Sequence, residues 1–208
     1  GNKFKFLNSY RKKIDKIIFS SVVPNVYKKV KKSIKNKLRV DIKELKQLNL
    51  KKILKIEVNT KQVGSDRLAN AISVINNKDN FIILDFGTAT TFDVVLKNKY
   101  KGGIIAPGVN LSLKTLVEKA KLIPNTKLTK IKNIIGNNTQ NAVRSGFYWG
   151  YQGLIENMIN LIEKKYKKKF KIIFTGGLSH LFKDTVKKKI KVDRDLTIKG
   201  LLRLVDSI

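Results

Sequence analysis

Residues 85–93 read Asp-Phe-Gly-Thr-Ala-Thr-Thr-Phe-Asp (DFGTATTFD). The apolar run before them predicts a buried strand over residues 81–85, and residues 90–96 predict a second strand that follows the turn. Gly87 permits a tight turn in which backbone N–H groups can approach a ligand closely, and the threonines add further donors. Asp85, at the end of the first strand, can hold a cation that bridges to phosphate. The segment fits either an anion-binding turn or an ordinary β-hairpin turn, and both interpretations stay open on this segment alone.

Two familiar phosphate-binding motifs are excluded at this turn. It is not a P-loop, because the sequence contains no Gly-Lys-Ser or Gly-Lys-Thr. The Asp-Phe-Gly triplet does not indicate a protein kinase, because the partner motifs His-Arg-Asp and Val-Ala-Ile-Lys are absent from the sequence. The anion-binding interpretation therefore rests on the glycine, the hydroxyl groups and the carboxylate themselves.

Further strands and helices are predicted on both sides of the turn. Hydrophobic spacing predicts strands over residues 14–23, 53–58 and 171–174, helices over residues 25–38, 64–76, 110–120, 139–165 and 196–204, and a glycine- and proline-rich loop over residues 102–108. Thr139 is the expected N-cap of the longest helix. Mixed strands and helices indicate an α/β protein. The pattern breaks at NNKDN, residues 76–80, so two domains are expected over residues 1–80 and 81–208.

A second segment of interest is Gly64-Ser65-Asp66-Arg67, at the start of the helix predicted over residues 64–76. Ser65 or Asp66 could simply cap this helix, a contribution of about 1 kcal/mol. The same geometry also suits catalysis, because Asp66 can accept a hydroxyl proton and Arg67 can bind a carboxylate or phosphate through two N–H groups. Both interpretations stay open on this segment alone.

Glycines recur in three other places. The loop predicted over residues 102–108 could be a plain connection or part of a site. Thr-Gly-Gly at residues 175–177 follows a predicted strand, where a pair of glycines can approach a nucleotide. Gly146, Gly150 and Gly153 form a stripe of small residues on the longest helix, which we interpret as a packing surface, for example in a dimer, since each costs the helix about 1 kcal/mol.

The composition excludes several kinds of site. The 208 residues include no Cys and one His, which excludes disulfides, Cys-based zinc sites, thiol nucleophiles and multi-histidine metal sites. No apolar run is long enough to span a membrane and no signal peptide is recognised, so a cytoplasmic protein is expected. The formal net charge is +30, and six of the 45 basic residues are Arg. We interpret the charge as a compositional bias toward solvated lysines, with a surface for nucleic acid or another polyanion as the alternative.

Taken together, these motifs resemble the type III pantothenate kinase family, also called the Bvg accessory factor family. The resemblance covers nearly the whole chain and rests, in this order, on IIFSSVVP (17–24), VGSDR (63–67), DFGTATTFDVV (85–95), GGIIAPGVNLSLKTL (102–116), NTQNAVRSGFYWGYQGLIE (138–156), FTGGL (174–178) and DLTIKGL (195–201). It implies an actin-like, ribonuclease H-like α/β fold of two domains, usually assembled as a homodimer.

The resemblance also implies an activity, the ATP-dependent phosphorylation of pantothenate to 4'-phosphopantothenate, which is the first step of coenzyme A biosynthesis. The resemblance implies that Asp66 would accept the proton of the pantothenate hydroxyl group. Gly64, Ser65 and Arg67 would bind pantothenate together with Asp66, and Thr139 would contact it across the dimer.

For ATP, the resemblance implies a contact from Thr88 and a monovalent cation, K⁺ or NH₄⁺, at Asp85. Mg²⁺ would accompany ATP. These roles agree with the interpretation of the turn from its residues, since phosphoryl transfer needs positioning, charge neutralisation and a base for the nucleophile.

The chain departs from the family pattern in two places. The family begins with a strand and an Asp-x-Gly-Asn-Thr phosphate hairpin that has no counterpart in the sequence, so the first domain is expected to lack this hairpin and one of its ATP contacts. Whether such a chain is active or an inactive fragment stays open. Glu57 stands seven residues before Gly64, where the family usually has Tyr.

Two other functions fit parts of the pattern. The net charge would suit a non-catalytic transcriptional accessory or nucleic-acid-binding protein on the same fold, and the fold would suit a kinase of another substrate, such as a sugar. Residues 81–96 contain no Lys or Arg, which counts against a nucleic-acid surface at the motifs. The expected partners are therefore pantothenate, ATP and a second copy of the chain, and neither a membrane nor a nucleic acid.

Overall fold

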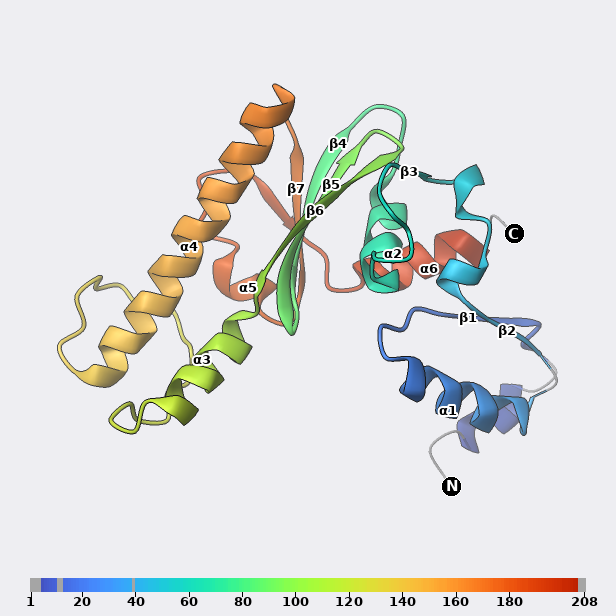
Figure 1. Ribbon diagram of the computed structural model, residues 1–208, viewed down its shortest axis with the longest axis horizontal. Helices are drawn as coiled ribbons and strands as arrows, with labels where there is room; N and C mark the ends of the chain where they lie inside the picture. The colour runs from blue at the N-terminus through green and yellow to red at the C-terminus, as the bar shows by residue number, and fades with distance from the viewer. Residues whose placement is uncertain (1–4, 11–12, 39, 206–208) are drawn as a thin grey trace. The chain divides into compact units, whose positions relative to one another are not determined.

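The computed structural model describes residues 5–10, 13–38 and 40–205, which form two compact units (Figure 1). Unit 1 contains residues up to 75, residues 98–100 and the residues from 196 onward, and unit 2 contains residues 76–97 and 101–195. The helix α6 (Leu196–Val205) thus belongs to unit 1, although it follows unit 2 in the sequence. The division into domains over residues 1–80 and 81–208 stays a prediction.

The centre of unit 2 is a sheet with the strand order β6–β5–β4–β7–β8. Its strands are β4 (Asn80–Phe86), β5 (Ala89–Leu96), β6 (Lys99–Pro107), β7 (Lys171–Gly176) and β8 (Ile190–Val192). β4 runs antiparallel to β5 and parallel to β7, and β7 runs parallel to β8. Numbered by their appearance in unit 2, the strands have the order 3-2-1-4-5, the ribonuclease H-like arrangement of actin-like proteins. The expected fold class is confirmed.

The inner strands of this sheet are apolar because both of their faces are covered. Residues Phe81–Leu84 of β4 and Ile172–Phe174 of β7 are all buried. Strands covered on both faces read as continuous apolar runs rather than as alternating ones. This is why the sequence predicts β4 and β7 clearly.

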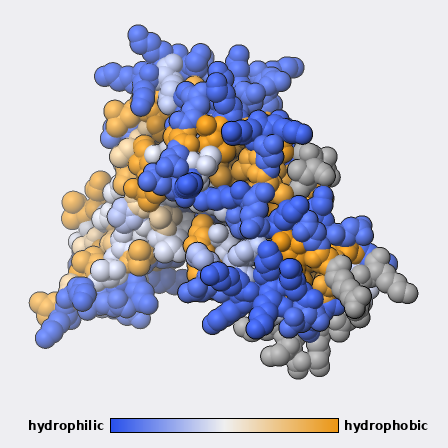
Figure 2. Space-filling model, turned by 45° about the vertical axis from the view of Figure 1, so that its right-hand side comes forward, coloured by the Kyte–Doolittle hydropathy of each residue, from blue (hydrophilic) through white to orange (hydrophobic). Residues whose placement is uncertain are grey.

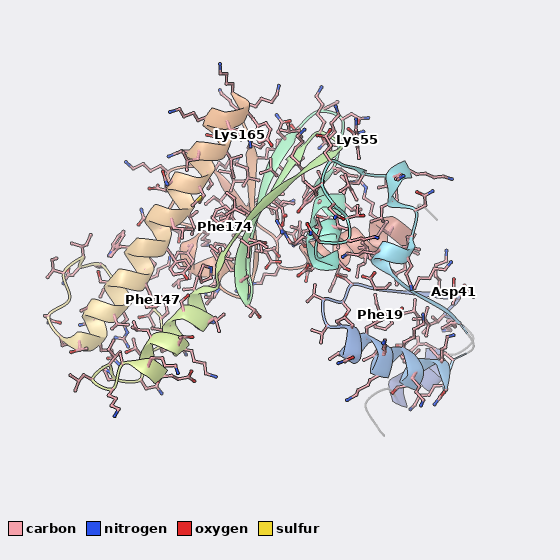
Figure 3. All side chains as sticks on the ribbon, viewed as in Figure 1. Phe19, Asp41, Lys55, Phe147, Lys165 and Phe174 are labelled. Carbon is pink, nitrogen blue, oxygen red and sulfur yellow. The ribbon has the colours of Figure 1, made fainter. Side chains whose placement is uncertain are left out.

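One face of the sheet is covered by the long helix α4 (Thr139–Tyr166) (Figure 1). Tyr148, Ile155, Ile159 and Ile162 of this helix share a core cluster with apolar residues of β4, β5 and β7. Phe174 is fully buried in this cluster, whereas Lys165 extends from the last turn of α4 (Figure 3). The first turn corrects one prediction: Asn138, and not Thr139, is the N-cap, because Asn138 Oδ1 accepts a hydrogen bond from Asn141 N at 2.9 Å.

Unit 1 contains a small parallel sheet and several helices. β1 (Lys16–Phe19) pairs with β2 (Asp41–Glu44), and α1 (Pro24–Lys35) connects the two strands. Three short 3₁₀ helices, η1 (Lys5–Tyr10), η2 (Leu45–Gln47) and η3 (Leu50–Lys52), flank them, and β3 (Lys55–Ile56) pairs with Lys99 and Tyr100 at the start of β6. Buried Ile34, Leu38 and Ile42 pack between α1 and the sheet.

The helix α2 (Ser65–Val74) packs closely on α6 within unit 1. A Cβ atom added to Gly200 would lie 1.9 Å from the carbonyl oxygen of Ala69, so the two backbones are in direct contact. Arg203 donates hydrogen bonds to the carbonyls of Ile72 and Ile75, at 3.2 and 2.7 Å. Because the last carbonyls of a helix have no partner within it, Arg203 satisfies the end of α2.

The structure overturns the loop predicted over residues 102–108, which is occupied by β6 as far as Pro107. Gly102 adopts a φ of 98°, which lets the strand continue through an irregular backbone position that other residues rarely adopt. The sequence pattern does not predict the short strands β2 and β8. β2 has one apolar residue in four and β8 has two in three, which is too few positions for a recognisable strand periodicity.

The remaining helices are α3 (Val109–Lys119) and α5 (Ser179–Phe182), both in unit 2. Within the ranges that the structure describes, no helix is long and apolar enough to cross a membrane. Hydrophilic residues cover much of the face seen in Figure 2, with apolar residues between them, as the net charge of +30 predicts.

Candidate active site

The β4–β5 turn forms the centre of the candidate site in unit 2. Gly87 N donates to the carbonyl of Ala89 at 3.1 Å, which closes the turn, and Gly87 and Thr88 are exposed at its tip. Phe86 pairs with Gly176 at the end of β7. The glycines that follow β4 and β7 therefore lie at the same edge of the sheet, which is where α/β proteins bind their ligands.

A second glycine contact fixes the start of α3 beside this turn. Gly108 is the N-cap of α3, and a Cβ atom added to it would lie 2.0 Å from the carbonyl oxygen of Thr88. The first N–H groups of a helix have no partner within it and carry a partial positive charge. The turn and the helix start together suit the binding of an anion.

A cleft of about 430 Å³ opens between these elements. It is lined by Phe86, Gly87, Thr88, Asn110, Leu111, Lys114, Gly177 and Leu178. Lys114 is the one charged residue in this lining, and it also lies 3.6 Å from Glu118 on the next turn of α3. Glycine backbone, a threonine, a helix start and a lysine are groups that bind phosphates, so the cleft fits a phosphate-bearing ligand.

Beside the turn, three oxygen-bearing side chains share one face of the sheet. Asp85 is opposite Thr91 on β5 and opposite Thr175 on β7, and residues in register on neighbouring strands point to the same face. Thr91 Oγ1 is buried and has no hydrogen-bond partner among the described residues. Carboxylate and hydroxyl oxygens are suitable ligands for a hard cation. The described residues contain no group of three or more His, Cys, Asp or Glu that could hold a metal ion.

The Gly64–Arg67 segment forms a separate candidate site in unit 1. α2 begins at Ser65 with Gly64 as its N-cap, so Ser65 does not cap the helix, whereas the Asp66 carboxylate does accept a backbone N–H of the first turn, as predicted. Asp66 Oδ1 accepts from the backbone N–H of Arg67 at 2.8 Å, and a Cβ atom on Gly64 would come within 2.4 Å of the same oxygen. The carboxylate of Asp66 therefore folds back over Gly64, and any larger residue at position 64 would displace it.

Ser65 has a different partner from its neighbours. Its hydroxyl donates to Glu44 Oε1 at the end of β2, and the same Glu44 side chain accepts from Lys46 N at 2.7 Å. Ser65 is buried, whereas Asp66 and Arg67 are half-buried. Ser65 thus connects the start of α2 to β2, while the following two side chains are half-buried and Nη2 of Arg67 is buried.

The structure brings together Gly64, Ser65, Asp66 and Arg67 within unit 1, and Asp85 and Thr88 within unit 2. Thr139 is exposed at the first position of α4 and is not part of the cleft lining. Sequence reasoning missed Lys114, whose position looks like an ordinary exposed lysine of an amphipathic helix. The spacing of Asn110 and Lys114, four residues apart on α3, was the available signal, because it places both side chains on one face of the helix.

The ribonuclease H-like sheet, with a glycine turn and a cleft at its edge, is typical of the class of actin-like kinases and ATPases. Residues 3–161 match the family model described as type III pantothenate kinase. The chain is 60% identical over 197 residues to the type III pantothenate kinase of Pelagibacter ubique strain HTCC1062, covering 95% of this chain and 79% of that protein. The chain therefore belongs to the type III pantothenate kinase family.

Other relatives agree with this assignment. The type III pantothenate kinase of Sulfurihydrogenibium sp. strain YO3AOP1 is 42% identical over 202 residues, which covers 94% of this chain and 80% of that protein. Among solved structures, a conserved protein of the Baf family of transcriptional activators from Campylobacter jejuni superposes with a TM-score of 0.66 at 20% identity. That alignment covers 97% of this chain and 87% of the other, and it supports the fold.

Proposed function

We propose that this chain phosphorylates pantothenate with ATP, giving 4'-phosphopantothenate and ADP, and so performs the first step of coenzyme A biosynthesis. The observation that carries the proposal is that the chain keeps both Gly-Ser-Asp-Arg and the Asp-Phe-Gly-Thr turn, while being 60% identical to a pantothenate kinase. The glycine-lined cleft in unit 2 supports it independently, because it has the groups that a nucleotide phosphate requires.

Pantothenate is bound by the start of α2 in this proposal. The carboxylate of Asp66 accepts the proton of the pantothenate hydroxyl as that oxygen attacks the γ-phosphorus of ATP. The guanidinium of Arg67 pairs with the pantothenate carboxylate, for which a planar group with paired donors is suited. Gly64 and Ser65 bind the substrate and keep the Asp66 carboxylate in position, as their contacts with Asp66 and Glu44 suggest.

ATP is bound by unit 2. Thr88 and the backbone of Gly87 contact the phosphates, and the N-terminus of α3 adds its partial positive charge. Lys114, on the same helix and in the same lining, neutralises part of the phosphate charge. Mg²⁺ enters with ATP and supplies further charge neutralisation when bound.

A monovalent cation, K⁺ or NH₄⁺, is bound at Asp85. The carboxylate of Asp85 and the hydroxyls of Thr91 and Thr175 fit this role, because all three side chains lie on one face of neighbouring strands. The buried, unpartnered Thr91 hydroxyl supports the assignment, since burying a polar group without a partner is costly. A bound cation would satisfy it and would reduce the negative charge beside the phosphates.

The chain acts as a homodimer in this proposal, with Thr139 of one copy contacting pantothenate bound to the other. Gly146, Gly150 and Gly153 support a surface on α4 that a second copy covers, since Cβ atoms at these positions would meet nothing within 4 Å among the described residues. Within the described chain these glycines are therefore not explained by close packing.

The proposal is tested by incubating the protein with pantothenate, ATP, Mg²⁺ and K⁺ and measuring 4'-phosphopantothenate by mass spectrometry together with ADP release. Product that requires both pantothenate and K⁺, and that falls when K⁺ is replaced by Na⁺, is the expected result. ATP hydrolysis that is independent of pantothenate, or phosphorylation of a sugar in preference to pantothenate, would contradict it. Sedimentation equilibrium measures the dimer on the same sample.

A further inference from the structure

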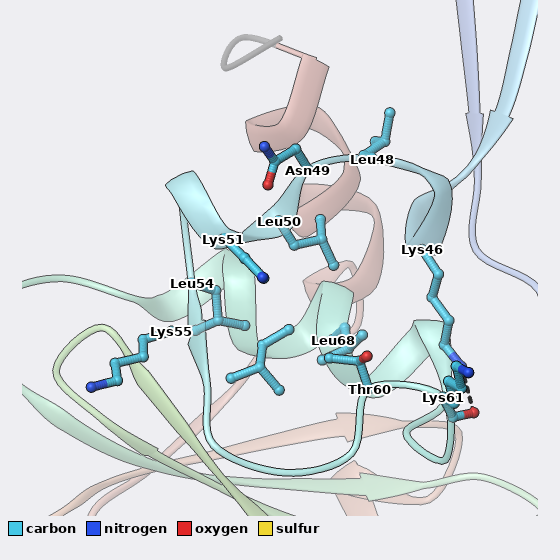
Figure 4. A pocket seen from close by; sticks show the side chains of 11 residues that line it. Lys46, Leu48, Asn49, Leu50, Lys51, Leu54, Lys55, Thr60, Lys61 and Leu68 are labelled. Atoms are coloured by element: carbon cyan, nitrogen blue, oxygen red, sulfur yellow. Dashed lines mark hydrogen bonds between the residues drawn. The ribbon is translucent and has the colours of Figure 1, made fainter.

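A pocket in unit 1 lies outside the residues assigned to pantothenate or ATP. Its volume is about 720 Å³, within the range of roughly 300–1,000 Å³ typical of small-molecule sites. It is lined by Lys46, Leu48, Asn49, Leu50, Lys51, Leu54, Lys55, Ile56, Thr60, Lys61 and Leu68 (Figure 4). Five of these eleven residues are Leu or Ile and four are Lys, so the lining combines an apolar surface with positive charge and contains no carboxylate.

The apolar residues form the floor of this pocket. Leu54 and Leu68 are fully buried and Leu50 is nearly so, while Ile56 is half-buried and reaches the pocket from β3. Leu50, Ile56 and Leu68 come from η3, β3 and α2, and Leu54 lies in the short connection between η3 and β3. An apolar chain or ring placed here would be removed from water, which contributes roughly 25 cal/mol per Å² of buried apolar surface.

The lysines are placed around this floor. In Figure 4 the Lys51 side chain points into the pocket, whereas that of Lys55 extends away from it. On the other side, Lys46 Nζ donates to the carbonyl of Lys61 at 3.3 Å, which holds one ammonium group at the rim. Neither Lys51 nor Lys61 forms an ion pair with a described acidic residue, so their charge is available to an anion.

The pocket opens on a different face from the proposed catalytic residue. Asp66 and Leu68 are two residues apart on α2, which separates them by about 200° around the helix axis. In and just after β3, Lys55 Nζ lies 4.0 Å from Glu57 Oε1, so these two side chains share one face. Ile56, which lines the pocket, points to the opposite face. The residues of the Gly64–Arg67 segment are not among the lining residues.

We propose that this pocket binds a small amphipathic anion, a carboxylate or phosphate group carried on an apolar chain or ring. The apolar part lies on Leu48 and Ile56, the half-buried apolar residues of the lining, above the buried Leu50, Leu54 and Leu68, and the anionic group pairs with Lys51 and with the Lys46–Lys61 rim. Each half of such a ligand matches one half of the lining, and a purely polar anion would leave Leu48 and Ile56 in contact with water. This inference does not depend on the proposed kinase activity, because binding is measured without pantothenate or ATP.

Calorimetric titration of the full chain with decanoate tests the proposal. Acetate carries the carboxylate without the alkyl chain, and decanol carries the alkyl chain without the carboxylate, so these two compounds serve as partial probes. Saturable one-to-one binding of decanoate is expected, and it should be at least about tenfold tighter than binding of either partial probe. Absence of saturable decanoate binding, or equal binding of decanol, would overturn the proposal.

Two variants locate the site. Lys51→Glu reverses the charge that points into the pocket and should weaken decanoate binding about tenfold, whereas Lys28→Glu makes the same charge change on α1 and should leave it unaltered. Thr60→Trp fills the pocket without a charge change and should also remove binding. Thermal unfolding confirms that each variant is folded. Unchanged binding in a folded Lys51→Glu or Thr60→Trp protein would place decanoate elsewhere and would refute the assignment.

Discussion

Gly108 and Thr88 lie in backbone contact, so closely that a Cβ atom on Gly108 would be 2.0 Å from the Thr88 carbonyl oxygen. The φ and ψ of Gly108, −72° and 142°, are open to any residue. The need for glycine is therefore steric and not conformational. This contact joins the start of α3 to the turn that carries Thr88, and so sets the width of the cleft.

Gly108→Ala should move α3 away from the turn and weaken ATP binding. The added methyl group would clash with the backbone carbonyl of Thr88, and no change of side-chain rotamer can relieve this clash. We therefore expect the ATP affinity to fall at least about tenfold and the free energy of unfolding to fall by roughly 1–3 kcal/mol. Fluorescence titration with a nucleotide analogue and urea unfolding measure the two effects.

Thr115→Ala is the matched control, because Thr115 is exposed on the same helix and is not among the residues that line the cleft. It should leave nucleotide affinity unchanged and stabilise α3 by a few tenths of a kcal/mol, since Ala is the better helix former. Equal effects of the two substitutions would show that the contact with Thr88 has no special role.

The sequence predicts the parts of the fold that depend on local hydrophobic spacing. α4 and the strands β4 and β5 are long and strongly patterned, and they lie within a residue or two of their expected limits. The sequence predicts a loop where β6 lies, because Gly102, Gly103 and Pro107 are turn residues in most contexts. Here the strand accommodates them, with Gly102 at a positive φ.

Long-range placement could not be predicted from spacing. The amphipathic pattern of α6 indicates a helix but not that it packs on α2, more than a hundred residues earlier, through Gly200 and Arg203. For the candidate site, the motifs identified Asp66, Asp85 and Thr88 by residue type. The contribution of Lys114 depends on how the start of α3 is fixed against the turn, which is a tertiary contact.

Asp66→Asn should lower kcat for pantothenate phosphorylation by roughly 10²–10⁴-fold, because the amide cannot accept the hydroxyl proton. The fold should be unaffected, since the amide oxygen can still accept from Arg67 N. Initial rates and thermal unfolding of the same preparation check both statements. Asp41→Asn, at an exposed ion pair with Lys43, is the control and should keep full activity. A rate near that of the wild type in Asp66→Asn would remove Asp66 from the role of base.

Lys114→Ala should raise the KM for ATP about fivefold, the modest effect expected of an exposed charge, and should change kcat less. Lys114→Arg keeps the charge and should restore most of the affinity. Lys119→Ala, at the last position of the same helix, removes an equal charge outside the cleft lining and serves as the control. If Lys119→Ala raised the KM equally, the effect would reflect net charge rather than a contact in the cleft.

The ion pair between Asp79 and Lys171 predicts how acid affects the stability of unit 2. Lys171 Nζ lies 2.6 Å from Asp79 Oδ2, and this hydrogen bond lowers the pKa of Asp79 below its usual value of 3.8. A carboxyl group whose pKa is depressed in the folded state contributes stability above its unfolded-state pKa, and the contribution is lost as the pH falls through the folded-state value. Urea unfolding should therefore show wild type more stable than Asp79→Asn at pH 7.

The difference between the two proteins should shrink below pH 4 and vanish in stronger acid. Lys171→Ala should reproduce the loss at pH 7, and the double variant should lose less than the sum of the two single variants, because both remove the same pair. A difference between wild type and Asp79→Asn that persisted unchanged down to pH 2 would show that the carboxylate does not stabilise this end of the sheet through its charge.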